Sequence, residues 1–289
     1  MAAFLDQTLT VPTLNEPARL DHFLAEHMPL SRQRIYRAID EGGVYVNKGR
    51  YRKAGLMLRG KEKLRVVTLE DETLIPFEAE QLIWQQDHLY LIHKKSGQYA
   101  QEALHRCLGT LPVELAQHLN LRGEEAKSLR PVHRLDRDTS GLMLFSSDPK
   151  MLQHLQNLWH SHVEKYYLAV VSPAPSWDSK RITLPIGKRR DRQGRYHVDT
   201  KGRACDTEAM VIERRDNEAL LKLTPHTGRT HQLRIHLSHL GHPILGDTRY
   251  GGKKHPRLML HAQSLYVHVP ALSENHEWHV DPEEDWQWR

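Results

Sequence analysis

An acidic run followed by a proline divides this chain into two segments of different character. Glu70-Asp71-Glu72 and then Pro76 come after a basic segment, and a new apolar pattern starts at Leu82. Such a run is typical of a linker. At about 100 to 200 residues per domain, a length of 289 residues also suggests two domains, one of them large. We therefore expect a small domain with its linker over residues 1–74 and a large domain over residues 75–289.

The composition is that of a folded chain. Hydrophobic residues make up 39% and charged residues 27%, which provides a core and is too balanced in sign for disorder. The two cysteines, Cys107 and Cys205, form no CxxC pair, so neither a disulfide framework nor a cysteine zinc site is supported. The N-terminus lacks a basic region followed by an apolar run, and no window approaches the roughly 18 apolar residues of a membrane span. We expect a cytoplasmic protein that is neither secreted nor embedded in a membrane.

Basic charge is spread over both segments. The net charge is +5, yet residues 19–65 alone carry 12 Lys or Arg against 5 Asp or Glu. The residues from 273 onward are acidic, with six Asp or Glu and one Arg. A basic surface attracts phosphate backbones, so charge favours a nucleic-acid ligand, with a merely solvated basic surface as the alternative.

The first segment has the pattern of two short helices and a hairpin. Apolar residues recur at helical spacing from Leu20 to Leu24 and from Ile35 to Ile39, the second set after the N-cap residue Ser31. Gly42-Gly43 ends that helix, and strands are expected at 44–46 and 64–67 around a turn at 47–49. Basic side chains on or beside these elements could follow a phosphate backbone. They are Arg32, Arg34, Arg37, Lys48, Arg50, Arg52 and Lys53.

This segment resembles the small RNA-binding domain first described in a small-subunit ribosomal protein. The matching pieces are Arg19-Leu20-Asp21, Leu30-Ser31-Arg32 and Gly43-Val44-x-Val46-Asn47. Gly60-Lys61 departs from the pattern, which usually has Gly-Asp before its last strand. A generic basic two-helix unit is the alternative.

The second segment mixes helices and strands without regular alternation. Apolar runs predict strands at 89–93, 142–145, 167–171, 220–223 and 258–260, and helical spacing predicts helices at 150–162 and 230–240. This order favours an α+β fold with a mixed, largely antiparallel sheet and flanking helices, preceded by the small helix-helix-hairpin domain. The acidic tail with Trp278, Trp286 and Trp288 is a packing or partner segment without an assigned role.

The most informative stretch runs from Pro131 to Gly141, directly before the apolar run 142–145. It holds a histidine, arginines, the carboxylates Asp136 and Asp138, and a Thr-Ser-Gly turn. A carboxylate in a loop that enters a buried strand has its charge tuned by nearby arginine, although an ordinary charged turn is the alternative.

Residues 133–141 resemble the HRLDxxTSG signature of the pseudouridine synthases that modify ribosomal and transfer RNA. Two further blocks of that family follow in order, Lys165-x-Tyr167-Leu-Ala and then GRTHQLRIH at 228–236 with GHPILGD at 241–247. A small RNA-binding domain before the catalytic domain is the arrangement of the bacterial enzymes of the C and D types, which modify the RNA of the large ribosomal subunit. Lys95 departs from the pattern, since the family commonly has Lys-Pro-x-Gly where this chain has Lys94-Lys95-Ser-Gly97.

The resemblance implies a role for four residues. Asp136 is the catalytic carboxylate, acting as a nucleophile or as a base, and Arg234 is the guanidinium that keeps it ionised. Tyr167 stacks on the target uracil, with a core tyrosine as the alternative. Arg134 fills the gap that the extruded base leaves. The resemblance implies no cofactor and no metal, and usually a monomer.

Two further clusters of side chains could bind a ligand. The loop 188–195, with Arg189, Arg190 and Arg192, is expected to contact RNA phosphates together with Arg229, unless it is only a solvated face. The histidines at 231, 236, 239 and 242 lack the i, i+4 pairing of helical metal ligands, so no metal site is expected there.

The sequence thus predicts an RNA pseudouridine synthase, with large-subunit ribosomal RNA as the preferred target and transfer RNA as the second. An RNA-binding ribosome assembly factor without catalytic activity is the alternative from another class. Such a relative would be expected to lose Asp136, Tyr167 or Arg234, and all three are present.

Overall fold

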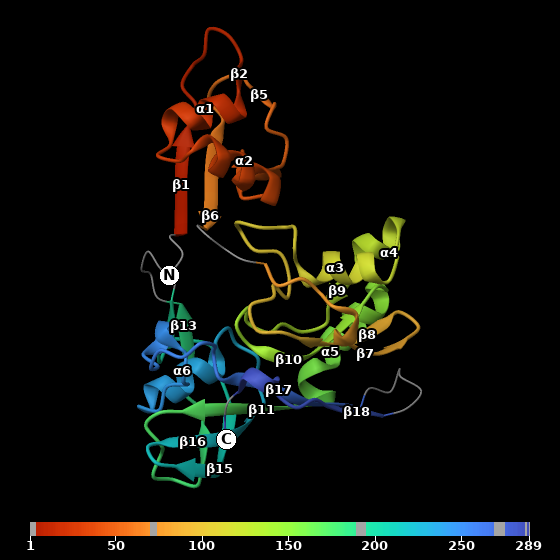
Figure 1. Cartoon of the computed structure of the whole chain (residues 1–289), viewed down its shortest axis with the longest axis vertical. Coiled ribbons are helices and arrows are strands. Elements are labelled where there is room, and N and C mark those ends of the chain that lie inside the picture. Colours follow the sequence, from red (N-terminus) through yellow and green to blue (C-terminus); the bar gives the residue numbers. More distant parts are fainter. Residues whose placement is uncertain (1–3, 70–73, 189–194, 269–274, 287, 289) are drawn as a thin grey trace. The chain divides into compact units, whose positions relative to one another are not determined.

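The computed structural model describes residues 4–69, 74–188, 195–268, 275–286 and 288. The chain divides into two compact units, which are shown in Figure 1. The first consists of residues 1–76 and 101–119, and the second of residues 77–100 and 120–289. The contiguous division expected from the sequence therefore differs from the observed one in the segment 101–119, which groups with the first unit.

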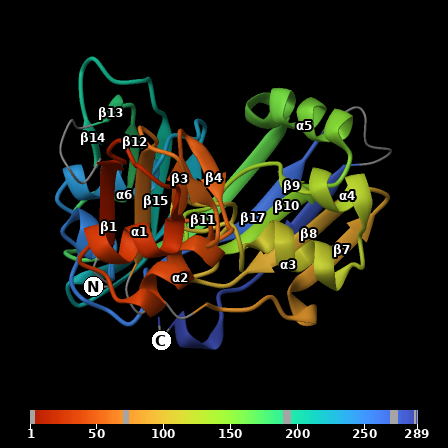
Figure 2. The same ribbon diagram turned by 90° about the horizontal axis from the view of Figure 1, so that it is seen from above.

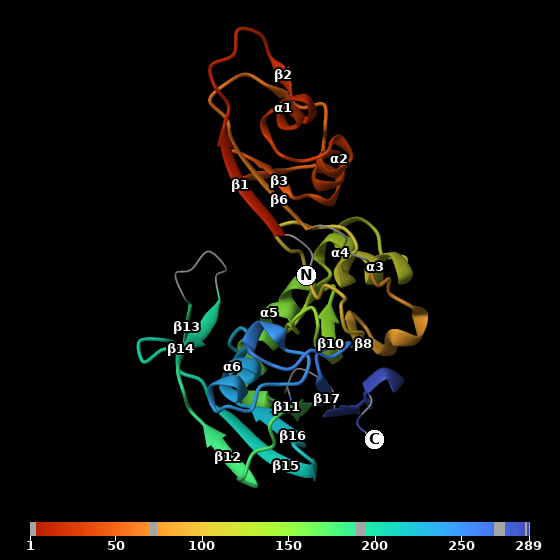
Figure 3. The ribbon, with the colours of Figure 1, turned by 60° about the vertical axis from the view of Figure 1, so that its left-hand side comes forward.

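The first unit is built on a small antiparallel sheet. Its four described strands lie in the order β1-β6-β3-β4. Helices α1 and α2 pack on this sheet through a core that includes Leu24, Ile35 and Leu64 (Figure 3). The elements are β1 (Phe4–Thr10), β2 (Ala18–Arg19), α1 (Leu20–His27), α2 (Arg32–Glu41), β3 (Val44–Val46), β4 (Gly49–Tyr51), β5 (Met57–Leu58), β6 (Lys63–Leu69) and α3 (Leu111–His118).

Local chemistry explains the helix bounds in this unit. The Ser31 side chain accepts a hydrogen bond from the Arg34 amide and caps α2, and Gly42 ends the helix in a left-handed conformation with φ 87°. Both helices expected from the sequence are confirmed. The strand β1 was missed, because only Leu5 and Leu9 of its seven residues are apolar and face the core.

The segment 101–119 is tied to the first unit by buried polar contacts. Arg106 is 1% exposed and pairs with Glu41 at 2.9 Å, while the Cys107 amide donates to the Glu41 carbonyl oxygen. Tyr45 donates through its hydroxyl to the Leu104 carbonyl oxygen. These long-range partners leave no periodic signal in the sequence, which is why sequence patterns place the segment in the other domain.

The second unit is a mixed sheet, as the sequence predicted. Its ten described strands follow the order β12-β15-β16-β11-β17-β10-β8-β7, with β18 beside β17 and β9 beside β10. Among these strands, β10 and β17 are the one parallel pair. The strands are β7 (Leu82–Gln86), β8 (Leu89–Lys94), β9 (Arg130–Pro131), β10 (Ser140–Ser146), β11 (Val163–Val171), β12 (Ser179–Ile182), β15 (Thr207–Arg215), β16 (Glu218–Pro225), β17 (Leu260–Val267) and β18 (His276–His279).

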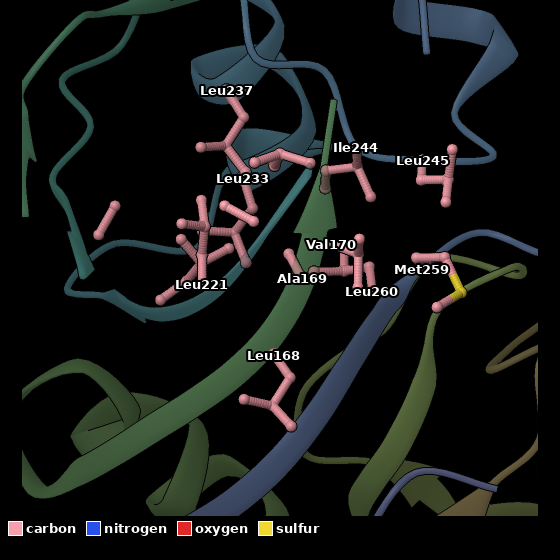
Figure 4. Close-up of a cluster of buried hydrophobic side chains, with 14 of the residues drawn as sticks. Leu168, Ala169, Val170, Leu221, Leu233, Leu237, Ile244, Leu245, Met259 and Leu260 are labelled. Atoms are coloured by element: carbon pink, nitrogen blue, oxygen red, sulfur yellow. The ribbon is translucent and has the colours of Figure 1, made fainter. Parts of the chain in front are cut away.

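Helices cover the sheet. Helix α5 (Pro149–His162) lies beside β10 and β11, and α6 (Gln232–His239) lies over the other half of the sheet (Figure 2). Leu233 and Leu237 of α6 enter a core with Val170 and Leu221 (Figure 4). The remaining elements are η1 (Ala79–Gln81), α4 (Gly123–Ser128), a hairpin of β13 (Ile186–Lys188) and β14 (Tyr196–Val198), η2 (Thr248–Tyr250) and η3 (Glu284–Trp286).

Most of the expected elements of this unit are confirmed, and one is wrong in its bounds. The helices predicted at 150–162 and 230–240 are α5 and α6. The strand predicted at 258–260 in fact starts at Leu260 and continues to Val267. The first half of β17, Leu-His-Ala-Gln, alternates apolar and polar residues, so the apolar run at 258–260 marked the start of the strand and not its extent.

Gly141 lets strands β10 and β17 approach each other closely at the centre of this sheet. It has φ 118°, and a Cβ there would lie 2.2 Å from the carbonyl oxygen of Ala262, its partner on β17. We predict that Gly141→Ala lowers the free energy of unfolding by roughly 2 to 5 kcal/mol, from strain plus overlap. Gly251→Ala is the matched control, because φ is 88° and no described atom lies within 4 Å of the added carbon. It should lose only about 1 to 2 kcal/mol in urea unfolding; equal losses would contradict the steric argument.

Candidate active site

Asp136 lies in the loop between β9 and β10. Its carbonyl oxygen accepts from the Thr139 amide at 3.1 Å, which closes a turn just before β10 begins at Ser140. Its side chain is 25% exposed, and Oδ2 accepts a hydrogen bond of 2.9 Å from Nη1 of Arg234. The structure therefore brings together two residues that are 98 positions apart in the sequence.

Arg234 is held in place by a second carboxylate. From helix α6 it donates through Nε and Nη2 to the two oxygens of Asp247, at 2.8 and 2.9 Å. Asp247 is 2% exposed. Burial acts to lower the pKa of Arg234, but the hydrogen bond to Asp247 and the charge of Asp136 outweigh it and raise the pKa. The bidentate pair fixes the plane of the guanidinium, so that its remaining nitrogen points at Asp136. The guanidinium as a whole stays positively charged.

Tyr167 belongs to the same site. It lies on β11, where it is partly buried and packs against the core of the α6 half of the sheet. Burial raises the pKa of its phenol, and the negative charge of Asp136 raises it further. The side chain therefore presents a neutral aromatic ring near Asp136 at neutral pH.

A buried lysine holds the loop that carries Asp136. The ammonium of Lys94, at the end of β8, is fully buried and donates to the carbonyl oxygens of Lys95, Arg137 and Thr139 at 3.0, 2.6 and 2.7 Å. The Gly97 amide donates to the Arg137 carbonyl as well. Although Lys95 stands where the family commonly has proline, residues 94–97 thus fasten the loop on both sides of Asp138.

The acidic tail anchors the other end of this loop. Arg257 donates to the Ser140 hydroxyl at 2.6 Å, and it pairs with Glu283 and Asp285 of the tail. Trp286 is 7% exposed and lies in the main core. The tail is therefore a packing segment of this unit.

His231 completes the polar surroundings of Asp136. It begins α6 in a left-handed conformation with φ 56°, and Nε2 lies 3.7 Å from Oδ2 of Asp136. Its Nδ1 lies 2.6 Å from the hydroxyl of Tyr250, whose ring faces the Arg234 guanidinium at 5.2 Å. Burial lowers the pKa of His231 against the opposing effect of Asp136.

One group of potential metal ligands occurs in the described part of the chain, formed by His93, His261 and Glu283. Both ring nitrogens of His261 already have partners, the Ser140 hydroxyl at 2.8 Å and the Val280 carbonyl at 3.0 Å. Glu283 binds Arg257. Because Glu283 pairs with Arg257 and both ring nitrogens of His261 have partners, this group is arranged as a hydrogen-bond network and not as a metal cage. The four histidines considered from the sequence do not form such a group among the described residues.

The predicted RNA-binding residues fall into three sets. Exposed side chains are those of Arg32, Arg37, Lys48, Arg134 and Arg229, while Arg34 is half-buried. Arg37 pairs with Glu41, and Arg50 and Arg52 donate to the carbonyl oxygens of Ala103 and Asp40, so these three also serve the fold. Arg189, Arg190 and Arg192 lie outside the described residues.

The chain matches known families over both units. Residues 88–239 match the RNA pseudouridylate synthase family and residues 18–64 match the S4 domain. A protein of Vibrio parahaemolyticus named ribosomal large subunit pseudouridine synthase C is 32% identical, over 90% of this chain and 87% of its own length. The protein of that name from Escherichia coli is 32% identical over 89% and 85%.

Solved structures agree with this match. The human RNA pseudouridylate synthase domain containing 4 superposes with a TM-score of 0.58 and 26% identity, over 72% of this chain and 90% of its own. The human RNA pseudouridylate synthase domain containing 1 gives 0.57 and 25%, over 72% and 86%. The chain belongs to the RNA pseudouridylate synthase family and is an isomerase that acts on RNA. None of the helices in the described part has the length and apolar character to span a membrane.

Sequence reasoning missed three residues that hold this site. Lys94 stands out in the sequence only through its neighbour Lys95, and Asp247 only as the end of a family block. Arg257 was not singled out. Each acts through a partner that is far away in the sequence, and a charged residue inside or beside an apolar strand is the one signal that marks Lys94 and Arg257 in advance.

The Lys94 anchor can be tested by comparing it with its neighbour. We predict that Lys94→Met lowers the free energy of unfolding by about 2 to 5 kcal/mol, because the buried carbonyls of Arg137 and Thr139 lose their donor. Turnover should fall as well, since the Asp136 loop is released. Lys95→Met removes an exposed ion pair with Glu78 and should cost no more than about 1 kcal/mol. Urea unfolding and a turnover assay compare the two, and matching losses would argue against the anchor.

His133 predicts that the loop carrying Asp136 is sensitive to acid. Its ring stacks on Trp159 with centroids 4.4 Å apart, Nε2 faces the Leu144 amide at 3.2 Å, and burial lowers its pKa from 6.5 to about 3. The unfolded chain therefore binds a proton that the native protein does not. Stability is complete above pH 6.5 and falls below it, by about 1.4 kcal/mol per pH unit from this group.

The measurement is urea unfolding from pH 7 down to about 4.5. His133→Gln should lose less stability over this interval than the wild type does, because it has no imidazole to titrate. His154→Gln changes an exposed histidine of α5 and should run parallel to the wild type. If His133→Gln is as acid-sensitive as the wild type, the ring is not kept neutral by burial.

Proposed function

We propose that Asp136 is the catalytic carboxylate of this synthase and that its target lies in large-subunit ribosomal RNA. The observation that supports the catalytic assignment is the bridge from Asp247 through Arg234 to Asp136. The two carboxylates and one guanidinium carry a formal net charge of −1, so the Arg234 cation pairs with Asp136 without cancelling the negative charge of the cluster. Family membership supplies the reaction for which this carboxylate is used.

The reaction is an isomerisation. The bond from ribose C1′ to N1 of uracil breaks, the base turns, and a bond from C1′ to C5 forms; the proton on C5 leaves and N1 gains one. No electrons are exchanged with a redox partner, so the chain needs no cofactor and no metal for this chemistry. An ionised carboxylate serves it as a nucleophile or as a base.

The remaining residues bind the substrate. Tyr167 stacks on the extruded uracil with its neutral ring, and Arg134, exposed two residues before Asp136, occupies the space that the base has left. Residues 1–74 bind RNA through Arg32, Arg34, Arg37 and Lys48, and the loop with Arg189, Arg190 and Arg192 binds RNA together with Arg229. The protein acts as a monomer in the cytoplasm.

The ribosomal target rests on the names of the relatives and on the S4 domain. Transfer RNA is the second candidate, since its structured loops also present single uridines. An assembly factor without activity is the third. It is disfavoured because the ion-paired carboxylate and the aromatic ring of the site are both in place.

The deciding experiment maps pseudouridine across total RNA from cells that lack the gene. The deletion strain is complemented with wild type, with Asp136→Asn, or with the matched control Asp138→Asn. Asp138 lies in the same loop but pairs with Arg137 at 2.8 Å, so its variant should retain activity. We expect one or more sites in large-subunit ribosomal RNA to disappear on deletion and to return with wild type and Asp138→Asn only.

Each other outcome has a defined meaning. A site that returns with Asp136→Asn contradicts the catalytic assignment. A lost site in transfer RNA contradicts the ribosomal target and leaves the chemistry intact. No change at any site favours the assembly factor.

A further inference from the structure

The Lys165 side chain is largely buried, and no described residue supplies a counter-charge for its ammonium. It lies on β11, two residues before Tyr167, and is 7% exposed. Within the described part of the chain no hydrogen bond or ion pair reaches its ammonium, and its nearest aromatic contact is the Trp159 ring, 5.9 Å from Nζ to the centroid. Burial lowers its pKa to about 8, so the group is still charged at neutral pH.

Such a lysine is unusual, because buried lysines are almost always paired. Removing an ammonium from water costs several kcal/mol unless an anion or several acceptors replace the water. Lys94 in the same unit shows the ordinary solution, with three carbonyl oxygens around its nitrogen. The missing partner of Lys165 therefore points to an anion that comes from outside the chain.

Two more basic groups lie within electrostatic range of Lys165: burial lowers the pKa of His160, and the charges of Lys165 and Arg229 lower it further. His160, in the last turn of α5, follows Trp159, and its ring lies 3.3 Å from where a side chain on Gly228 would begin. Arg229 follows that glycine, is exposed, and donates only to the Ala204 carbonyl at 3.4 Å. None of these three basic residues pairs with a carboxylate in the described part of the chain. Lys165 lies on β11, His160 on α5, and Arg229 in the loop before α6. Because residue 228 is a glycine, this loop can lie close to His160 of α5.

We propose that Lys165, with His160 and Arg229, binds a phosphate group of the RNA strand beside the target uridine. The phosphate is the one anionic group of RNA, and it supplies the charge that Lys165 lacks. The position beside the target rests on the proposed role of Tyr167, which faces the base. By fixing the backbone of the extruded nucleotide, the contact makes Lys165 a positioning residue for the reaction.

The first test compares RNA affinity in the full-length protein. The probe is a short oligouridylate, and the variants are Lys165→Met, Lys165→Arg and the control Lys150→Met, which removes an exposed lysine at the start of α5. We expect Lys165→Met to weaken binding by about tenfold to a hundredfold, as loss of a charged hydrogen bond implies. The slope of log affinity against log salt should fall by about 0.7 for one phosphate. Lys165→Arg and Lys150→Met should bind as the wild type does.

Thermal unfolding separates binding from packing. Because Lys165 is an unpaired buried charge, Lys165→Met should melt at the same temperature as the wild type or higher while it binds RNA more weakly. A residue that serves only the fold would show the reverse. The proposal would be overturned if Lys165→Met melted at a lower temperature than the wild type and Lys165→Arg also lost its affinity for RNA.

A second measurement observes the group directly. Carbon NMR of lysines labelled at the ε position follows the titration of Lys165, whose signal is identified by its absence in Lys165→Met. Oligouridylate should raise the pKa of Lys165 above its free value of about 8 and leave the Lys150 signal unchanged. If the RNA binds and the titration of Lys165 does not move, the proposal fails. Neither measurement needs catalysis or a known target, so its outcome is independent of the role of Asp136 and of the ribosomal assignment.

Discussion

The guanidinium of Arg234 is the interaction on which the site depends. It joins helix α6 to the loop before β10 by binding Asp247 with two nitrogens and Asp136 with the third. The pairing to Asp247 is almost fully buried, so little water competes for those hydrogen bonds. Asp136 is more exposed, with a quarter of its side chain accessible. One buried arginine thus fixes the position of the carboxylate for which we propose the catalytic role.

The loop of Asp136 has little freedom of its own. Lys94 holds the carbonyls at positions 137 and 139 from β8, and Arg257 holds the Ser140 hydroxyl from the other side. Arg257 is in turn fixed by the acidic tail through Glu283 and Asp285. The catalytic role that we propose for Asp136 would benefit from such preorganisation, because the loop is ordered during folding and not at each turnover.

The sequence predicted the residues of the candidate site better than it predicted the residues that hold them in place. HRLDxxTSG at 133–141 and the blocks around Tyr167 and Arg234 pointed to residues that the structure brings together around Asp136, since those positions match a known pattern. Asp247, Arg257 and the tail could not be assigned, because their roles come from partners that only the fold brings near. The same reason explains strand β1 and the segment 101–119, whose partners on β6 and on Glu41 carry no local periodicity. The helices α5 and α6 were predictable because their apolar spacing is a property of the segment itself.

The basic side chains buried in the second unit are of two kinds: three are paired within the protein, and Lys165 has no partner among the described residues. Arg234 and Arg257 each pair with two carboxylates, and Lys94 donates to three carbonyl oxygens, so the charge of each group is met by acceptors within this unit. Lys165, by contrast, has no acceptor among the described residues. The chain has 36 Asp and Glu residues, so a shortage of acidic residues does not explain the difference. Lys165 also lies on the same strand as the tyrosine that faces the carboxylate. An unpaired charge in that position costs stability in the free protein and is retained where a ligand supplies the missing anion.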